Sequence, residues 1–253
     1  MQRAPNRPRS IEGGTPPASA PHRVRLPVNL HRWADITFLH WPYPPEEVAA
    51  LLPDQLSVLT HGGRAWVGVT PFFIHVRLPG IGRTALDRAF PETNVRTYVT
   101  GPDGRQGIWF LHMEVTAAWF VAALRAVGLP YVRRRMSVDA QPARISYRSS
   151  PRRPGAQGGH AIVVRPGEPL RPPEGGERER FLTARWGAYH RRGPALLYTP
   201  VEHGPWPLRS AQVDTCEVGS LFAAAGLSVP AGAPLACFSP GVEVKVGPPR
   251  LVC

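Results

Sequence analysis

The sequence predicts an α+β protein built around a strongly bent antiparallel β-sheet or barrel, with a few flanking helices. Proline and glycine contribute 31 and 25 of the 253 residues, which favours many turns over a bundle of long helices. Short apolar runs separated by turn signals recur along the chain, and few segments have helical periodicity. Because 43% of the residues are hydrophobic, the chain can build a packed core, and global disorder is excluded. These observations together favour a sheet made of hairpins.

Residues 1–26 predict a disordered basic leader, and residues 27–253 predict a single domain. The leader is rich in Pro, Arg, Gly and Ser without periodicity, and it lacks the apolar segment of a signal peptide. No stretch of about 18 apolar residues occurs anywhere, so no membrane span is expected. The three cysteines are too few and too widely spaced for a disulfide framework or a zinc site. We therefore expect a cytoplasmic protein, and the sequence carries no signature of an oligomeric state.

In the first half of the domain, alternating hydrophobicity predicts strands and proline marks a helix. Strands are expected at 33–41, 56–60, 64–77, 94–100 and 107–115. A short helix is expected over 44–52, because prolines occupy its first turn and two glutamates favour the positive end of its dipole. Pro71 indicates an edge, a bulge or a break in its strand. The Gly-Pro-Asp-Gly sequence at 101–104 predicts a hairpin between its flanking strands.

In the second half, helices are expected at 116–127, 177–189 and 218–226. The first is apolar almost all round and is therefore predicted to be buried. Residues 136–148 and 159–165 are expected to form one hairpin, followed by a Pro/Gly linker at 166–176. The final strands are expected at 195–202, 210–217, 235–238 and 242–246.

The most informative polar pattern lies in the strand around residues 92–99. Strand alternation places Asn94, Arg96 and Tyr98 on one face, and Glu92 continues that face. A polar row between hydrophobic runs is typical of a cavity lining, although a solvent face or a structural Glu92–Arg96 ion pair would produce the same pattern.

The next strand repeats the pattern. Alternation groups Ile108, Phe110, His112 and Glu114 on one face. His112 and Glu114 could donate or accept protons in a closed site. A row of side chains that changes from apolar to polar along the strand also suits the interior of a barrel whose open end is filled with water.

The basic charge has two readings. The formal net charge is +12, and the 30 basic residues are 29 arginines and a single lysine, Lys245. Seven arginines lie in 133–153, where they could form a nucleic-acid footprint or a solvated hairpin. No nucleic-acid-binding motif accompanies them, so the solvated hairpin is favoured.

Searches for other chemistry find no nucleophile elbow, phosphate loop or metal-binding motif. The histidines show no ligand spacing and no carboxylate cluster suits a metal, so we expect neither a metal nor a cofactor.

Five runs of the sequence resemble the uncharacterised YqjF-like family, which is assigned an acetoacetate-decarboxylase-like fold. The resemblance covers about residues 27–252, and FPE-x-NVR-x-Y is its most specific motif. The runs are HWPYPPEEVAALLPDQLSV (40–58), RAWVGVTPF (64–72), FPETNVRTYV (90–99), LPYVRRRM (129–136) and SPGVEVKV (239–246). His112 and Glu114 depart from the family pattern, where Ser and Asp are expected. The resemblance implies a β-cone with a central cavity, but fold alone does not imply the reaction.

Acetoacetate decarboxylase uses a Schiff-base lysine, and this chain lacks it. The resemblance would place that lysine just after Pro130, where this sequence reads Tyr131, Val132 and Arg133. An arginine stays protonated and is not an amine nucleophile. One of that enzyme's two glutamates aligns approximately with Glu92, whereas the second falls in an apolar run. The cavity is therefore expected to persist without imine chemistry.

Three functions follow as hypotheses. The first is a protein that binds a small, partly apolar keto or carboxylate molecule in its central cavity. Polar contacts would come from Glu92, Asn94, Arg96 and Glu114, with Arg96 holding a carboxylate or enolate. The walls would be Tyr98, His112 and Tyr131. The second is a lysine-independent lyase or isomerase that uses Glu92 or Glu114 as its acid or base. The third is a nucleic-acid-binding module at 133–153.

Overall fold

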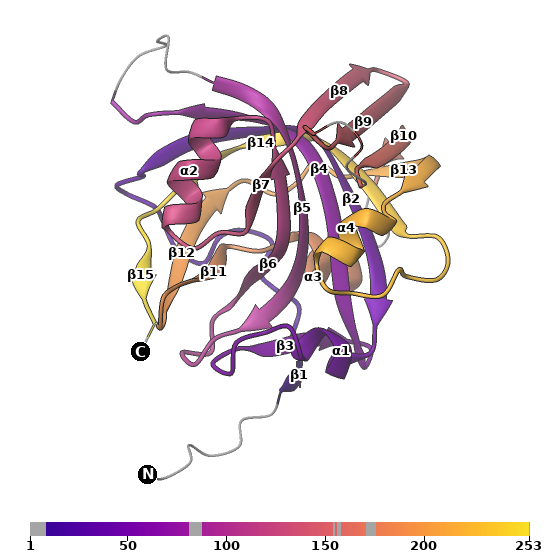
Figure 1. The fold of residues 1–253 in the computed structure, drawn as a ribbon. Coiled ribbons are helices and arrows are strands. Elements are labelled where there is room, and N and C mark those ends of the chain that lie inside the picture. Colours follow the sequence, from indigo (N-terminus) through magenta and orange to yellow (C-terminus); the bar gives the residue numbers. More distant parts are fainter. Residues whose placement is uncertain (1–8, 81–87, 154, 156–157, 171–175, 253) are drawn as a thin grey trace.

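The computed structural model describes residues 9–80, 88–153, 155, 158–170 and 176–252. Within this part of the chain, 15 strands form one connected sheet against which four short helices pack (Figure 1). The predicted α+β class with a bent, mainly antiparallel sheet is confirmed. The elements are β1 (Ser10–Glu12), β2 (Asn29–Tyr43), α1 (Pro45–Ala49), β3 (Ser57–His61), β4 (Arg64–Arg77), β5 (Arg88–Thr100), β6 (Gln106–Val115), α2 (Ala118–Ala126), β7 (Tyr131–Arg133), β8 (Arg135–Gln141), β9 (Arg144–Ser150), β10 (His160–Pro169), α3 (Glu177–Thr183), β11 (Gly187–Arg192), β12 (Ala195–His203), β13 (Arg209–Glu217), α4 (Gly219–Ala224), β14 (Leu235–Val246) and β15 (Arg250–Leu251).

The long strands close into a ring. β2 pairs with β4 and β14, β5 pairs with β4 and β6, and β11 pairs with β6 and β12. β12 pairs with β14 and completes the circuit. All these pairings are antiparallel except β6–β11. Bulges bend the strands, so the ring has the shape of a bent cone and is not an even barrel.

Pro71 marks the largest of these bends. In the β2–β4 ladder Ala34 pairs with Phe73 and Leu39 pairs with Val69, so β2 carries one extra residue opposite Pro71. Asp35 in this bulge has a φ of 49°, which few non-glycine residues adopt. Proline has no backbone N–H to donate, and at a bulge the β2–β4 ladder does not need one. Pro71 therefore lies at one of the kinds of position that the sequence predicted for it.

A second layer covers the outer face of the ring. β13, β10, β9 and β8 continue the sheet from β14, and in Figure 1 the β8–β9 hairpin projects away from the ring. Tyr147 and Ile162 from this layer, together with Phe222 of α4, share one buried core with ring residues such as Trp41 and Val69.

The interior of the ring has a separate core, which is closed by a helix at each end. Phe120 of α2 packs with Phe90 and Tyr131 at one end. Phe181 of α3 packs against Tyr98 at the other end, with ring centroids 5.5 Å apart. Residues of the polar row therefore extend between two apolar caps.

Part of the predicted leader is ordered. Ser10–Glu12 pairs in parallel with β3, and the Glu12 carboxylate accepts hydrogen bonds from Thr60 and from the backbone N–H of Gly62. Disorder over all of 1–26 was therefore wrong for this strand, because a local sequence scan does not see its pairing partner 48 positions away. Residues 1–8 lie outside the described residues.

Three other expected elements differ. The helix expected over 177–189 ends at Thr183, residues 184–186 form a connection, and β11 begins at Gly187 and pairs with both β12 and β6. Residues 136–148 divide into β8 and β9 around a turn after Gln141. The helix α2 buries only Phe120 and Val121, because one side of it faces solvent.

Candidate functional site

The predicted polar row of β5 points into the interior of the ring. Glu92, Asn94, Arg96 and Tyr98 are all buried, with exposed fractions between 0% and 7%. In the ladders Glu92 lies beside Phe72 of β4, an interior core residue, so the row faces inward. A solvent face, one of the alternatives for this pattern, is excluded.

Glu92 sits in a small hydrogen-bonded group near the α2 end. Tyr131 Oη donates to Glu92 Oε2 at 2.9 Å, and Asn94 Nδ2 donates to Glu92 Oε1 at 3.4 Å. Burial raises the pKa of Glu92 to about 7, and these two hydrogen bonds oppose the rise only in part. A carboxyl with a pKa near neutrality can donate or accept a proton at physiological pH.

Two arginines share the interior. Arg96 and Arg185 are 7% and 3% exposed, and neither has a carboxylate within salt-bridge distance among the described residues. Arg96 lies over the Phe38 ring at 5.3 Å, and Arg185 lies over Tyr98 at 4.7 Å. The ion pair between Glu92 and Arg96, the other alternative for the polar pattern, does not form among the described residues.

Several donors of these arginines have no acceptor. Nε of Arg96 and both Nε and Nη2 of Arg185 are buried without a hydrogen-bond partner in the described chain, as are Thr70 Oγ1 and Asn94 Oδ1. The lost hydration of Arg185, and then repulsion from Arg96, lower its pKa to about 10, so it remains cationic at neutral pH. Buried donors without partners are rare in folded proteins and mark a place for water or a ligand.

His40 and Tyr98 form a hydrogen-bonded pair near the two arginines. His40 Nε2 and Tyr98 Oη are 2.6 Å apart, and Tyr98 Oη also donates to the backbone carbonyl of Leu182. Burial holds the pKa of His40 well below its usual value, and the charges of Arg96 and Arg185 add to the effect. His40 is therefore neutral, and it adds no positive charge to that of Arg96 and Arg185.

Glu114 and His112 lie on the other face of the sheet, which corrects the expected grouping. The β5–β6 ladder has a bulge: Arg96 pairs with Phe110 and Val95 pairs with His112, so Leu111 is an extra residue. Phe110 thus faces inward with Arg96, whereas His112 and Glu114 face outward. A one-residue bulge reverses the alternation on which the sequence prediction depended.

On that outer side Glu114 is surrounded by donors. Ser149 Oγ donates to its Oε2 at 2.5 Å and Arg134 Nε donates to its Oε1 at 2.9 Å, while nitrogens of His112 and His160 lie at 3.3 Å. Burial opposes ionisation, but the hydrogen bonds from the two histidines and Ser149 outweigh it and hold the pKa of Glu114 well below its usual range. Glu114 is therefore a saturated carboxylate that joins β6, β9 and β10.

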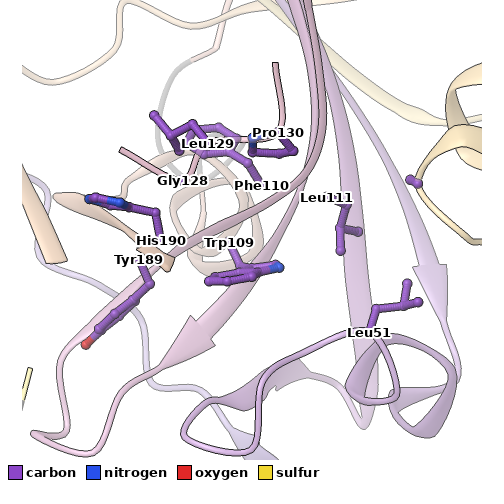
Figure 2. Close-up of a pocket in the computed structure, with 10 residues that line it drawn as sticks. Leu51, Trp109, Phe110, Leu111, Gly128, Leu129, Pro130, Tyr189 and His190 are labelled. Atoms are coloured by element: carbon purple, nitrogen blue, oxygen red, sulfur yellow. The ribbon is translucent and has the colours of Figure 1, made fainter. Parts of the chain in front are cut away.

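Two pockets in the described part of the chain open outside the polar row. One of about 680 Å³ lies on the outer layer and is lined by polar residues that include Arg135 and Arg148. The other, of about 240 Å³, lies in the wall of the ring and is lined by Trp109, Phe110 and Leu129, among others (Figure 2). Neither is lined by Glu92, Asn94 or Arg96.

Sequence reasoning missed Arg185, His40 and Thr70. Arg185 follows the apolar run Phe-Leu-Thr-Ala, and a charge inside such a run was the available signal. Its position in the ring depends on the end of α3, which local patterns do not fix. His40 and Thr70 lie in strands whose inward faces are otherwise apolar and gave no signal.

No group of three or more His, Cys, Asp or Glu side chains in the described ranges could hold a metal ion. In the same ranges, no helix is both long and apolar enough to cross a membrane.

The sequence comparisons match most of the chain. Residues 31–243 match DUF2071, a family described as an uncharacterized conserved protein. The chain is 30% identical over 223 residues to the uncharacterized protein YqjF of Bacillus subtilis (strain 168), which covers 86% of this chain and 90% of YqjF.

The solved structures most informative for the fold resemble acetoacetate decarboxylase. An acetoacetate decarboxylase-like enzyme from Sphingomonas wittichii RW1 matches with a TM-score of 0.61 and 12% identity, covering 90% of this chain and 94% of that one. The enduracididine biosynthesis enzyme MppR, complexed with pyruvate, matches with a TM-score of 0.63 and 15% identity, covering 89% and 91%. At such identities the likeness shows the fold, which is acetoacetate-decarboxylase-like.

Proposed function

We propose that this chain, which belongs to the DUF2071 family of uncharacterized conserved proteins, binds a small, partly apolar carboxylate inside its ring. Arg96 and Arg185 bind the carboxylate, and Asn94 orients a keto or enol oxygen near Glu92, which Tyr131 holds in place by its hydrogen bond. The observation that carries the proposal is the pair of buried guanidinium groups without a carboxylate partner in the described chain. An uncompensated buried charge is costly, and an anionic ligand between the two groups would compensate it.

The rest of the interior suits a ligand with an apolar part. Phe38, Phe72 and Met113 are buried on the same inward face as the polar row. An arginine can donate two parallel hydrogen bonds to a carboxylate, which fixes orientation as well as charge. The structural neighbour MppR was solved with pyruvate, a small keto carboxylate, which supports this ligand class without assigning it.

Schiff-base chemistry is not part of the proposal. Lys245 is half exposed on β14, where Nζ pairs with Glu202 Oε1 at 3.3 Å. An imine-forming lysine must reach a carbonyl ligand from within the binding cavity, whereas Lys245 lies at the surface in an ion pair. The proposal includes a cytoplasmic location, with which the free thiols of Cys216 and Cys237 agree.

Calorimetric titration with pyruvate and acetoacetate tests binding. The variants Arg96→Met and Arg185→Met each remove one guanidinium, and Arg148→Met, on the outer layer, is the matched control. We expect each interior variant to weaken binding by roughly 10- to 100-fold, the range for a lost charged hydrogen bond. Absence of binding to the unmodified protein, or equal affinities in all variants, would contradict the proposal.

A second candidate function is proton transfer at the carbon next to a keto group, without a lysine. Its specific support is the raised pKa of Glu92, to about 7, on the same inward strand face as Arg96. Glu92 would take the C–H proton, and Arg96 would stabilise the enolate formed. Exchange of the methyl protons of pyruvate in D₂O, followed by NMR, should be faster with the protein than without it and should be lost in Glu92→Gln. Exchange that is unchanged in that variant would exclude Glu92 as the base.

A further inference from the structure

We infer that the pocket in the ring wall is the binding site for the apolar end of the same ligand, so that the substrate class is a keto acid with a phenyl-sized or branched apolar substituent. This inference rests on the proposed function. It starts from the position of the pocket, which straddles the wall of the ring at a gap between strands.

The gap lies along the outer edge of β6. On that edge β11 is in register with Ile108 and Trp109, and β7 is in register from Met113 onward. Neither strand is in register with residues 110–112, and Leu111 in this stretch is the bulged residue. The wall of the ring is therefore interrupted at one short segment.

Side chains from both faces of the sheet line this pocket. Trp109, Leu111 and Leu51 belong to the core outside the ring, whereas Phe110 and Leu129 pack against the core inside it. Figure 2 shows Phe110 beside Leu129 and Pro130, with Trp109 on the adjoining part of the strand. The pocket therefore lies at the interruption, between the two faces of the sheet.

Phe110 separates this pocket from the polar row. It pairs with Arg96 in the ladder, so its ring lies on the same inward face, and it is only partly buried. A ligand carboxylate held at Arg96 would therefore lie on the neighbouring strand position to Phe110, which lines the wall pocket. The geometry fits an elongated ligand whose charged end is inside and whose apolar end is in the wall.

The volume and chemistry of the pocket select the occupant. Its volume of about 240 Å³ is below the roughly 300–1,000 Å³ of pockets that hold an entire drug-sized ligand. A dry cavity of about 150 Å³ is enough for benzene. Among the described residues that line the pocket, the titratable ones are His190 and Tyr189, and their polar atoms already have hydrogen-bond partners. The ring nitrogens of His190 bond to Val127 O and Thr199 Oγ1, and the Tyr189 hydroxyl bonds to Asp103 and Arg105. The lining thus offers an apolar contact and no free ionic partner.

Paired titrations with pyruvate and phenylpyruvate test the inference, since these ligands share the keto carboxylate and differ by a phenyl ring. We expect the unmodified protein to bind phenylpyruvate roughly 10- to 100-fold more tightly, the range for burying one aromatic side chain. Leu129→Trp should fill the pocket and abolish that preference while pyruvate affinity stays within about twofold. Val229→Trp, at a residue 64% exposed on the surface, is the matched control and should keep the preference.

A second variant keeps the test decisive if Leu129→Trp does not fold. Leu51→Arg places a charge on the outer rim of the pocket and should also remove the preference. In addition, phenylpyruvate but not pyruvate should change the fluorescence contributed by Trp109, and Trp109→Phe should remove this difference. Equal affinities of the unmodified protein for the two ligands, or a preference that survives both pocket variants, would overturn the inference while pyruvate binding still supports the interior site. If the unmodified protein does not bind pyruvate at all, the proposed function is refuted, and this inference with it.

Discussion

Glu92 and Glu114 lie on opposite faces of one β-ladder. Glu92 pairs with Val115 and Glu114 pairs with Thr93, so the two carboxyl groups are neighbours in register but point to different sides of the ring wall. Inside, Glu92 meets Tyr131, Asn94 and apolar surface. Outside, Glu114 meets two histidines, a serine and an arginine. The same side chain therefore has opposite ionisation behaviour in the two environments.

The pH dependence of stability should distinguish the two glutamates. The pKa of Glu92 rises from 4.5 to about 7 on folding, so the folded state holds its proton over a range where the unfolded state has lost it. Stability should fall as pH rises from about 4.5 through 7, by about 3 kcal/mol for this group. Glu92→Gln should remove this decline. Urea unfolding of both proteins at pH 5 and pH 8 measures it, and an equal decline in the variant would refute the assignment.

Glu114 should show the opposite sign. Its pKa is lowered on folding, so its contribution is complete above about 4.5 and is lost as pH falls toward the folded pKa. Glu114→Gln leaves buried donors with a weaker acceptor and should cost about 3–5 kcal/mol at pH 7. Its effect should shrink in acid, as the unmodified protein loses the same contribution. Urea unfolding that shows a cost below about 1 kcal/mol at pH 7 would contradict a structural role.

The ligand-free protein should become more stable when one interior arginine is neutralised. Replacing a buried, unpaired guanidinium with an apolar chain of similar length removes a desolvation cost, so Arg185→Met should raise the unfolding free energy by about 1–4 kcal/mol. The same variant should lose stabilisation by ligand. Thermal unfolding with and without acetoacetate checks both effects, and Arg148→Met provides the surface comparison. A variant that is destabilised without ligand would show that the contacts of Arg185 with the Tyr98 and Phe181 rings and with the Ala184 carbonyl outweigh the cost of burying its charge.

Reduction by borohydride in the presence of acetoacetate should give no covalent adduct. The lone lysine is half exposed and paired with Glu202, and imine formation needs a neutral amine. Intact-mass spectrometry measures the result directly. Adduct formation that disappears in Lys245→Arg would overturn the exclusion of Schiff-base chemistry.

The arginine-rich segment should not retain nucleic acid. Arg134 is bound to Glu114, and Arg133 Nε donates to the backbone carbonyl of Thr116, so two of its seven arginines already have partners in the fold. Electrophoretic mobility of DNA and RNA at about 20 mM salt should be unchanged by the protein. Retention that weakens steeply between low and moderate salt would instead support a phosphate-binding surface.

The features that local sequence predicted correctly are those with local causes. The Gly-Pro-Asp-Gly turn at 101–104 forms a hairpin because its own residues favour one, and Gly101 N–H donates to Arg105 O at 3.0 Å. Pro71 marks the β2 bulge because a proline lacks the N–H that the ladder needs. The inward row of β5 follows from simple alternation in a strand that stays regular up to the ladder bulge.

The features that sequence could not predict depend on distant contacts. Because Leu111 is an extra residue in β6, the side chains that follow it point to the opposite face from the one that simple alternation predicts. The sequence therefore placed His112 and Glu114 on the wrong face of the sheet. Arg185 enters the ring because α3 ends against Tyr98, which is 84 positions from the Leu182 carbonyl it binds. Compared with the sequence prediction, the candidate site therefore gains Arg185 and loses His112 and Glu114.

A crystal structure of the protein soaked with acetoacetate tests the central claim most directly. Binding between the two arginines should give electron density inside the ring, with carboxylate oxygens within hydrogen-bond distance of both the Arg96 and the Arg185 guanidinium groups. Density only in the outer-layer pocket beside Arg148, or an empty ring at a saturating ligand concentration, would contradict it.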